Sequence, residues 1–238
     1  PIPSQTFLIL KKTAMITARQ KNKILQIVNV FETGTIDGAY DQIVVFNDGK
    51  NNSRQITYGR SQTTEQGNLK SLIEMYIQMN GIFSADFQTY INKIGKTALA
   101  DDKDFKALLR KAAREDIIMR TTQDEFFDLI YYMPAFQFFE GNGFTLALSL
   151  LVIYDSYIHS GSIPAFLRNR FSETPPIKGG DEKAWIKAYV KARHEWLSTH
   201  TKKILQATKY RTQCFLTLIK NDNWDMVLPV VANGTRVD

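Results

Sequence analysis

Apolar residues recur at helical spacing in the first part of the chain and predict an amphipathic helix between Thr17 and Gly34. The apolar positions of this stripe are Ile24, Ile27, Val28 and Phe31. The segment Thr17-Ala-Arg-Gln20 fits a capping box, in which the threonine side chain accepts from one backbone amide and the glutamine reaches back to another. Gly34 is a natural stop. Glu32 therefore falls in the last turn of this helix or just beyond it.

After this helix, the spacing of the apolar residues changes to one typical of β-strands. Two short runs rich in β-branched and aromatic residues, IVVF at 43–46 and QITY at 55–58, flank a polar stretch that begins Asn47-Asp48-Gly49. Such runs around an Asp-Gly signal predict a small antiparallel hairpin with a long polar tip. Asp48 lies at its turn.

Helical spacing dominates the rest of the sequence. An apolar stripe at 69–76 predicts a helix closed by Gly81, and no further strand is predicted from about Phe83 onward. The further predicted helices cover 83–94, 102–120, 123–139, 143–159, 181–198 and 202–220. The expected fold class is mainly α (α+β), with one small antiparallel sheet early in the chain.

Three charged residues share helix faces with apolar neighbours. Helical periodicity places Asp155 on the same helix face as Leu148 and Leu151. Arg193 shares a face with Ile186 and Val190 in the same way. Arg211 shares one with Ile204 and Phe215. An unpaired buried charge costs several kcal/mol or more, so such groups normally pair with one another. The alternative is that they lie at the edges of the stripes and extend to water.

Composition narrows the class of protein. With 238 residues, 44% hydrophobic and 23% charged, the chain is typical of an ordered globular protein. The longest apolar run, FTLALSLLVIY from Phe144, is shorter than the roughly 18 residues of a membrane span, so it predicts a buried helix and no membrane insertion. The net charge of +6 favours an anionic partner. No motif indicates nucleic-acid binding.

Metal and cofactor chemistry find no support in the sequence. Cys214 is the only cysteine, and His159, His194 and His200 lack the spacing of a helical metal pair. We expect neither a metal nor an organic cofactor.

Two carboxylates at the ends of neighbouring elements suggest a different chemistry. Hydrolysis of a glycosidic bond takes one carboxylic acid to protonate the leaving oxygen and one carboxylate to activate water or attack directly. Glu32 at a helix end and Asp48 at a hairpin can face each other in this way. They lie sixteen positions apart, but with 24 Asp and Glu in the chain this spacing alone does not distinguish them from surface acids.

A resemblance supports the pair. The stretch FETGTIDGAYDQIVVFNDG from Phe31 resembles the start of the chitosanases of glycoside hydrolase family 46. Later segments agree in order, and the similarity runs from about residue 16 to about 225. They are ITYGRSQTT from Ile56, YYMPA from Tyr131, LALSLLVIYDSYIHSG from Leu146 and GGDEKAWIKAYVKAR from Gly179.

The resemblance implies a lysozyme-like fold of two lobes, with the hairpin sheet in the N-terminal lobe. Residues 1–15 are expected to be an extension or linker, and 16–238 a single two-lobed hydrolase domain. Glu32 corresponds to the general acid and Asp48 to the general base of an inverting hydrolysis, which requires about 6.5 to 9.5 Å between the carboxyl groups. Thr57 corresponds to the threonine that holds the attacking water.

The resemblance also assigns residues around this pair. Asp155, Arg193 and Arg211 correspond to the ionic network behind the acid. Candidate substrate contacts are Tyr40, Tyr58, Arg60 and Asn68. The expected activity is endo-acting cleavage of β-1,4 bonds in an amino-sugar polysaccharide by a monomer. Because such polymers lie outside the cell, a secreted or cell-envelope location is expected.

The sequence departs from the family pattern in three places, one of which is Ser160, where the family has a histidine before glycine. Gly49 is followed by KNNSRQ where the family continues directly with Arg-Gly-Tyr, and Asn68 stands where the family has an aspartate that meets a glucosamine ammonium. An amide attracts an ammonium less than a carboxylate does. Two substrates remain open. The family resemblance favours chitosan, whereas these departures and the basic net charge favour peptidoglycan. An inactive sugar-binding protein on the same fold is the alternative function.

Overall fold

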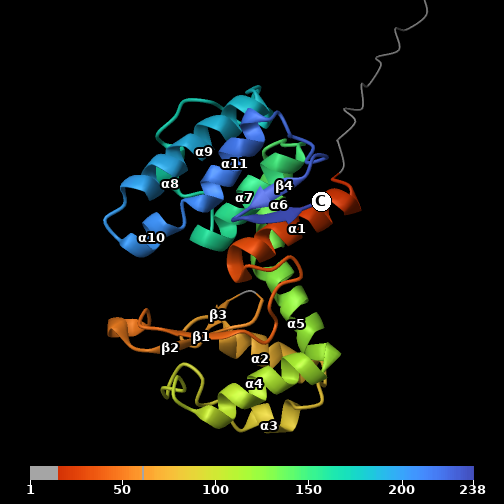
Figure 1. Cartoon of the computed structure of the whole chain (residues 1–238), viewed down its shortest axis with the longest axis vertical. Helices are drawn as coiled ribbons and strands as arrows, with labels where there is room; N and C mark the ends of the chain where they lie inside the picture. Colours follow the sequence, from red (N-terminus) through yellow and green to blue (C-terminus); the bar gives the residue numbers. More distant parts are fainter. Residues whose placement is uncertain (1–15, 61) are drawn as a thin grey trace, which may run out of the picture.

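The computed structural model describes residues 16–60 and 62–238, so the predicted extension at 1–15 lies outside the described residues. Two groups of elements form two lobes, one above the other in Figure 1, and each has its own hydrophobic core. This arrangement, mainly helical with a small antiparallel sheet in the N-terminal lobe, confirms the predicted fold class.

The lower lobe in Figure 1 contains the predicted hairpin. Strands β1 (Ile43–Phe46), β2 (Gln55–Tyr58) and β3 (Thr63–Thr64) form an antiparallel sheet in that order. The helices of this lobe are α2 (Leu69–Gln78), α3 (Ser84–Gln88), α4 (Lys103–Glu115) and α5 (Ile117–Phe127). Their apolar faces and β2 share a core that includes Ile56, Leu72, Tyr76, Phe105 and Met119. The hairpin is thus supported by helices underneath it.

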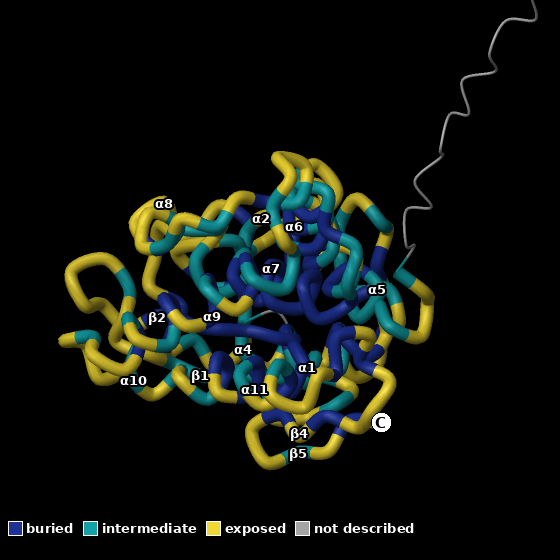
Figure 2. Tube along the Cα trace, turned by 90° about the horizontal axis from the view of Figure 1, so that it is seen from above, coloured by how far each residue is buried: buried dark blue, intermediate teal, exposed yellow. Residues whose placement is uncertain are grey.

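The upper lobe is built around α7 (Ala147–Ser160), which is buried along its first ten residues and runs through the interior (Figure 2). The surrounding helices are α1 (Ala18–Thr33), α6 (Met133–Gly141), α8 (Ala165–Arg168), α9 (Glu182–Thr199), α10 (Lys203–Ala207) and α11 (Tyr210–Lys220). Among the described residues, no helix combines the length and apolarity needed to cross a membrane.

One continuous helical segment joins the lobes. Helix α5 passes through a π-helical stretch, Asp128–Tyr132, directly into α6. Phe126 belongs to the lower core and Phe127 to the upper core. The junction between the lobes therefore lies at the end of α5, next to the π-helical turns.

The structure corrects several predicted helix boundaries. The helix expected at 102–120 is broken at Asp116, whose backbone is extended and whose carboxylate accepts from the Ile118 amide and from the Tyr76 hydroxyl. Asp116 therefore caps a new helix instead of continuing the old one. The helix expected at 83–94 is only the short α3, and the one expected at 202–220 is divided into α10 and α11.

The expectation of no strand after Phe83 is also wrong. Strands β4 (Val230–Ala232) and β5 (Thr235–Val237) form a hairpin that packs on α1. Asn233 and Gly234 at its turn have φ angles of 44° and 85°, the left-handed conformation that two-residue hairpin loops favour. The buried ammonium of Lys23 in α1 donates to the carbonyls of Met226 and Leu228, at 3.0 and 2.9 Å, and so fixes the segment leading into this hairpin.

Candidate active site

Glu32 lies in the last turn of α1, as the sequence predicted. Thr17 and Gln20 form the expected capping box at the start of the helix. Gly34 ends it in the left-handed conformation, with φ 76°, and its amide bonds to the carbonyl of Val30. The Glu32 side chain keeps only 13% of its surface exposed, because α11 covers it on one side.

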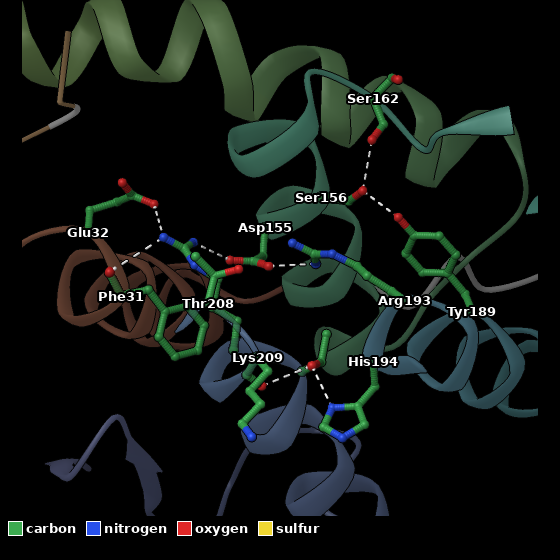
Figure 3. Close-up of polar contacts among 12 residues, drawn as sticks. Phe31, Glu32, Asp155, Ser156, Ser162, Tyr189, Arg193, His194, Thr208 and Lys209 are labelled. Carbon is green, nitrogen blue, oxygen red and sulfur yellow. Dashed lines mark hydrogen bonds and ion pairs between the residues drawn. The ribbon is translucent and has the colours of Figure 1, made fainter. Parts of the chain in front are cut away.

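A chain of ion pairs leads from Glu32 into the upper core (Figure 3). Arg211 Nη2 donates to Glu32 Oε1 at 2.6 Å, and its Nη1 donates to Asp155 Oδ1 at 2.8 Å. The other oxygen of Asp155 accepts from Arg193 Nη1 at 2.6 Å. The side chains of Asp155 and Arg193 are 0% and 1% exposed, so these charges face the core and do not reach water.

The charges in this chain stabilise one another. Burial alone would raise the pKa of Asp155, but Arg193 and Arg211 outweigh it and hold that pKa below its usual range. Burial alone would lower the pKa of Arg211, whereas Glu32 and Asp155 raise it well above its usual value. Asp155 is therefore ionised and Arg211 protonated at neutral pH.

Aromatic contacts fix the end of α1 against α11. The Tyr210 hydroxyl donates to the carbonyl of Phe31 at 2.8 Å, and the Arg211 guanidinium lies 5.4 Å from the centre of the Phe31 ring. The rings of Phe31 and Tyr210 meet edge to face. The carboxylate of Glu32 thus extends from a helix end that is held in place by its neighbours.

Asp48 lies on the other lobe, just after β1 and exposed to solvent. Its Oδ1 accepts a hydrogen bond of 2.9 Å from Gln55 Nε2, which belongs to β2. Figure 1 shows the hairpin that carries Asp48 extending below the helices of the upper lobe. The separation of about 6.5 to 9.5 Å between the two carboxyl groups stays a prediction.

Thr57 is 5% exposed and lies opposite Val44 in the hairpin. Its hydroxyl oxygen is buried and has no hydrogen-bond partner among the described residues. Most buried hydroxyls are hydrogen-bonded, so a lone one calls for a specific reason such as an ordered water.

Tyr40 and Arg60 meet at a third carboxylate, Asp124 of α5. The Tyr40 hydroxyl donates to Asp124 Oδ1 at 2.9 Å, and Arg60 Nη1 donates to the same oxygen at 2.7 Å. Arg60 Nε also donates to Asn29 of α1, so this 4% exposed arginine links both lobes. Burial and the nearby Asp124 raise the pKa of Tyr40 to about 12, which keeps its hydroxyl a donor at neutral pH.

These residues line a polar pocket of about 290 Å³. Its walls come from α1, from the segment between α1 and β1, from Arg60 after β2, and from α5 with the start of the π-helical stretch. The lining residues are Asn22, Leu25, Gln26, Asn29, Ile36, Asp37, Tyr40, Arg60, Asp124 and Asp128. Glu32 and Asp48 are not among them, so the pocket is distinct from the surroundings of the two candidate catalytic acids.

The structure corrects the expectation that Tyr58 contacts sugar. Tyr58 is 0% exposed, lies in the lower core, and donates its hydroxyl to the Leu109 carbonyl at 2.8 Å. A ring covered on both faces by protein cannot stack on a substrate. The central strand β2 is buried along its whole length, which the alternating pattern of its residues does not reveal.

Asn68 immediately precedes α2 and is half-buried. Its side chain lies close to the hydroxyl of Tyr131, which belongs to the π-helical turns at the lobe junction. The pKa of Tyr131 is raised, mainly by burial. The charge of Glu32 adds to this rise and the nearby Asn68 amide opposes it. The pKa of Tyr131 therefore depends on groups from both lobes, Asn68 in the lower lobe and Glu32 in the upper lobe.

Several residues around the candidate site were not predicted from the sequence. Gln55 is hydrogen-bonded to Asp48, and Asp124 to Tyr40. Tyr210 is hydrogen-bonded to the end of α1. A glutamine at a strand start or an aspartate on an exposed helix face carries no distinctive pattern. Within the described residues, no group of three or more His, Cys, Asp or Glu side chains is arranged to hold a metal ion.

Comparison with known proteins adds an independent result. The sequence profile of glycosyl hydrolase family 46 matches residues 26–230. A chitosanase of Bacillus subtilis (strain 168) is 25% identical over 229 residues, which cover 89% of this chain and 80% of the relative.

Solved structures share the fold. The native chitosanase of Bacillus subtilis MY002 superposes with a TM-score of 0.78 at 21% identity, covering 92% of this chain and 97% of that protein. A family 46 chitosanase of Gynuella sunshinyii in complex with chitotetraose gives a TM-score of 0.79 at 21% identity, covering 93% and 98%. At this level of identity the likeness shows the fold.

Proposed function

The chain belongs to glycosyl hydrolase family 46, and on this premise we propose that it is an endo-acting, inverting hydrolase of the β-1,4 bonds of chitosan. Membership makes the chain a glycoside hydrolase. The observation that carries the finer proposal is the chain of ion pairs from Arg193 to Glu32, because it fixes one carboxyl group at the boundary between buried and exposed surface.

In the proposed reaction Glu32 is the general acid. Its carboxyl group gives a proton to the glycosidic oxygen while the bond between that oxygen and the anomeric carbon breaks. The Arg211 guanidinium then stabilises the resulting carboxylate through a charge-assisted hydrogen bond. This interaction is strongest after proton transfer, so it favours the later stage of the reaction.

Asp48 is the proposed general base. It takes a proton from a water molecule whose oxygen attacks the anomeric carbon from the face opposite the leaving group, and the configuration at that carbon inverts. The buried hydroxyl of Thr57, which has no partner within the described part of the chain, supports a role in holding this water. The sugar chain is proposed to lie between the helix end that carries Glu32 and the hairpin that carries Asp48.

Peptidoglycan is a second candidate substrate, favoured by specific observations. Asn68 supplies an amide where the family pattern has a carboxylate, and the chain carries a net charge of +6. An amide suits an uncharged acetamido group better than an ammonium, and a basic protein is attracted to an anionic wall polymer. Both polymers lie outside the cell, so we propose that the protein acts there or in the cell envelope. We also propose that it acts as a monomer.

Incubation with chitosan and with purified peptidoglycan separates these proposals. We expect oligosaccharides of several lengths from chitosan, identified by mass spectrometry, with the initial products in the inverted α configuration by NMR. Muropeptides from peptidoglycan alone would establish the second substrate. Products that retain the β configuration would refute the roles of Glu32 and Asp48. The absence of products from both polymers would favour an inactive sugar-binding protein.

A further inference from the structure

The tip of the β1–β2 hairpin, which carries Asp48, contains the residues KNNSRQ that separate this chain from the family pattern. The last of them, Gln55, is the first residue of β2 and is only 5% exposed. A glutamine is seldom so buried unless both ends of its amide are hydrogen-bonded.

Both ends of the Gln55 amide are used. Its Nε2 donates to Asp48 Oδ1 at 2.9 Å, and its Oε1 accepts from the backbone amide of Gln66 at 3.1 Å. The amide orientation is therefore set by Gln66, because only a carbonyl oxygen can accept that backbone N–H. The NH₂ group is left to face Asp48.

Gln66 also organises the rest of the tip. Its Oε1 accepts from the Lys50 amide at 2.6 Å, and its Nε2 donates to Ser53 Oγ at 2.8 Å. The space inside the tip is filled, since a Cβ added at Gly49 would lie 2.7 Å from Gln66 Nε2. The tip is thus a hydrogen-bonded loop closed around one glutamine side chain.

We propose that Gln55 is a positioning residue that holds the Asp48 carboxylate for catalysis; this inference rests on the proposed function. Asp48 is exposed, so without a partner its side chain would rotate freely. The bond to Oδ1 restricts rotation of the carboxylate, and no described residue donates to Oδ2, which remains for the water. A general base must lie within about 2.6 to 3.2 Å of the water that it deprotonates. A misplacement of about 1 Å can cost about 100-fold in rate.

A structural role is the competing explanation, in which Gln55 only closes the tip through Gln66. Three variants separate the two roles. Gln55→Met removes both hydrogen bonds with little change in length. Gln55→Glu, in its ionised form, retains an acceptor for the Gln66 amide but has no donor for Asp48 and places a like charge beside it. Arg54→Gln, the control, removes the exposed ion pair with Asp101 at the same tip and leaves Asp48 untouched.

Kinetics on the cleaved polymer give the first measurement. We expect kcat to fall at least about tenfold in both Gln55 variants while KM stays within about twofold, because positioning acts on the chemical step. Arg54→Gln should stay within about twofold of the wild type in both constants. Wild-type kcat in Gln55→Glu would assign Gln55 to the fold of the tip and overturn the proposal.

Crystal structures of the wild type and of Gln55→Met give a measurement that needs no substrate. The Asp48 carboxylate should move by more than about 0.5 Å or become spread over rotamers in the variant. An Asp48 carboxylate that stays in place in Gln55→Met overturns the inference even if kcat of that variant falls. If Gln55→Met does not fold, Gln55→Glu takes its place.

A separate experiment tests the catalytic role of Asp48 independently of the role of Gln55. Full activity of Asp48→Asn would remove Asp48 from the reaction, whatever Gln55 does. Loss of activity in Asp48→Asn together with wild-type kcat in Gln55→Met would leave the general base in place and overturn only the positioning role.

Discussion

Arg211 Nη2 lies 2.6 Å from Glu32 Oε1, and this hydrogen bond ties the end of the first helix to a guanidinium 179 residues later. The same guanidinium also binds Asp155, so Glu32 is the outermost member of an ordered series of charges. The position of this carboxyl group is therefore set by the core of the upper lobe. A rigid support of this kind is what a catalytic group requires.

Glu32→Gln should reduce kcat by about 10² to 10⁴, the usual contribution of general acid catalysis. The amide oxygen can still accept from Arg211, so the melting temperature should stay close to that of the wild type. Glu74→Gln, which alters a half-exposed carboxylate in α2 paired with Lys70, is the control and should keep full activity. A Glu32→Gln enzyme with activity within tenfold of the wild type would exclude the acid role.

Thr57→Val should lower kcat about tenfold without lowering stability. The hydroxyl has no partner among the described residues, and an apolar group of the same shape replaces it at little cost. Loss of one hydrogen bond to the attacking water, worth about 1.4 kcal/mol, accounts for the rate. Thr63→Val is the matched control, because its hydroxyl donates to the Tyr58 carbonyl. That variant should lose about 1 kcal/mol of stability and keep its kcat. Unaltered kcat in Thr57→Val would count against the proposed water contact.

Arg193→Ala should lower the free energy of unfolding by about 3 to 5 kcal/mol, because it leaves part of the buried charge of Asp155 uncompensated. Arg236→Ala removes an exposed ion pair with Asp238 and should cost less than about 1 kcal/mol. Urea denaturation of the two variants gives both values. A loss below about 1 kcal/mol for Arg193→Ala would contradict a structural contribution of the ion-pair chain.

The stability of the protein should decrease as the pH falls from about 6.5 to 4. Burial and the nearby Arg193 lower the pKa of His159 from 6.5 to about 4. Between these values the unfolded chain binds a proton that the folded protein does not, so the contribution of His159 is fully present above 6.5 and is lost as the pH falls through 4. His159→Gln should flatten the dependence in urea denaturation between pH 4.5 and 7.5. An unchanged slope would contradict the assignment to His159.

Lys23→Met should cost about 1 to 3 kcal/mol, because it leaves the buried carbonyls of Met226 and Leu228 without their donor. Amide hydrogen exchange in β4 and β5 should accelerate more than in α7. Lys70→Met changes a half-buried surface residue paired with Glu74 and should stay within about 0.5 kcal/mol of the wild type. Equal exchange rates in wild type and Lys23→Met would show that the hairpin does not depend on this lysine.

Features encoded by neighbouring residues could be predicted from the sequence. The capping box at Thr17, the apolar stripe and Gly34 all lie within one helix, so its bounds and the position of Glu32 followed from them. Periodicity also indicated that Asp155, Arg193 and Arg211 face the core. The cost of buried charge indicated that they pair, but the partners are 38 and 56 positions apart, and the family resemblance was needed to assign them to one network behind Glu32.

Features that depend on distant contacts could not be predicted. Asp116 ends a helix because Tyr76 and the Ile82 amide bond to its carboxylate from 40 and 34 residues away. The strands β4 and β5 have three residues each, too few for an alternating pattern to be recognised. Their only local signal was Asn233-Gly234, the dipeptide typical of tight hairpin turns.

When Glu32 is ionised, the four members of the ion-pair chain carry two negative and two positive formal charges, and all are largely removed from solvent. A neutral, enclosed set of charges is screened little by dissolved ions, whose effect falls on exposed charges. The support of Glu32 should therefore be insensitive to ionic strength. Any dependence of the reaction rate on added salt would then report the encounter between the basic protein surface and its polymer.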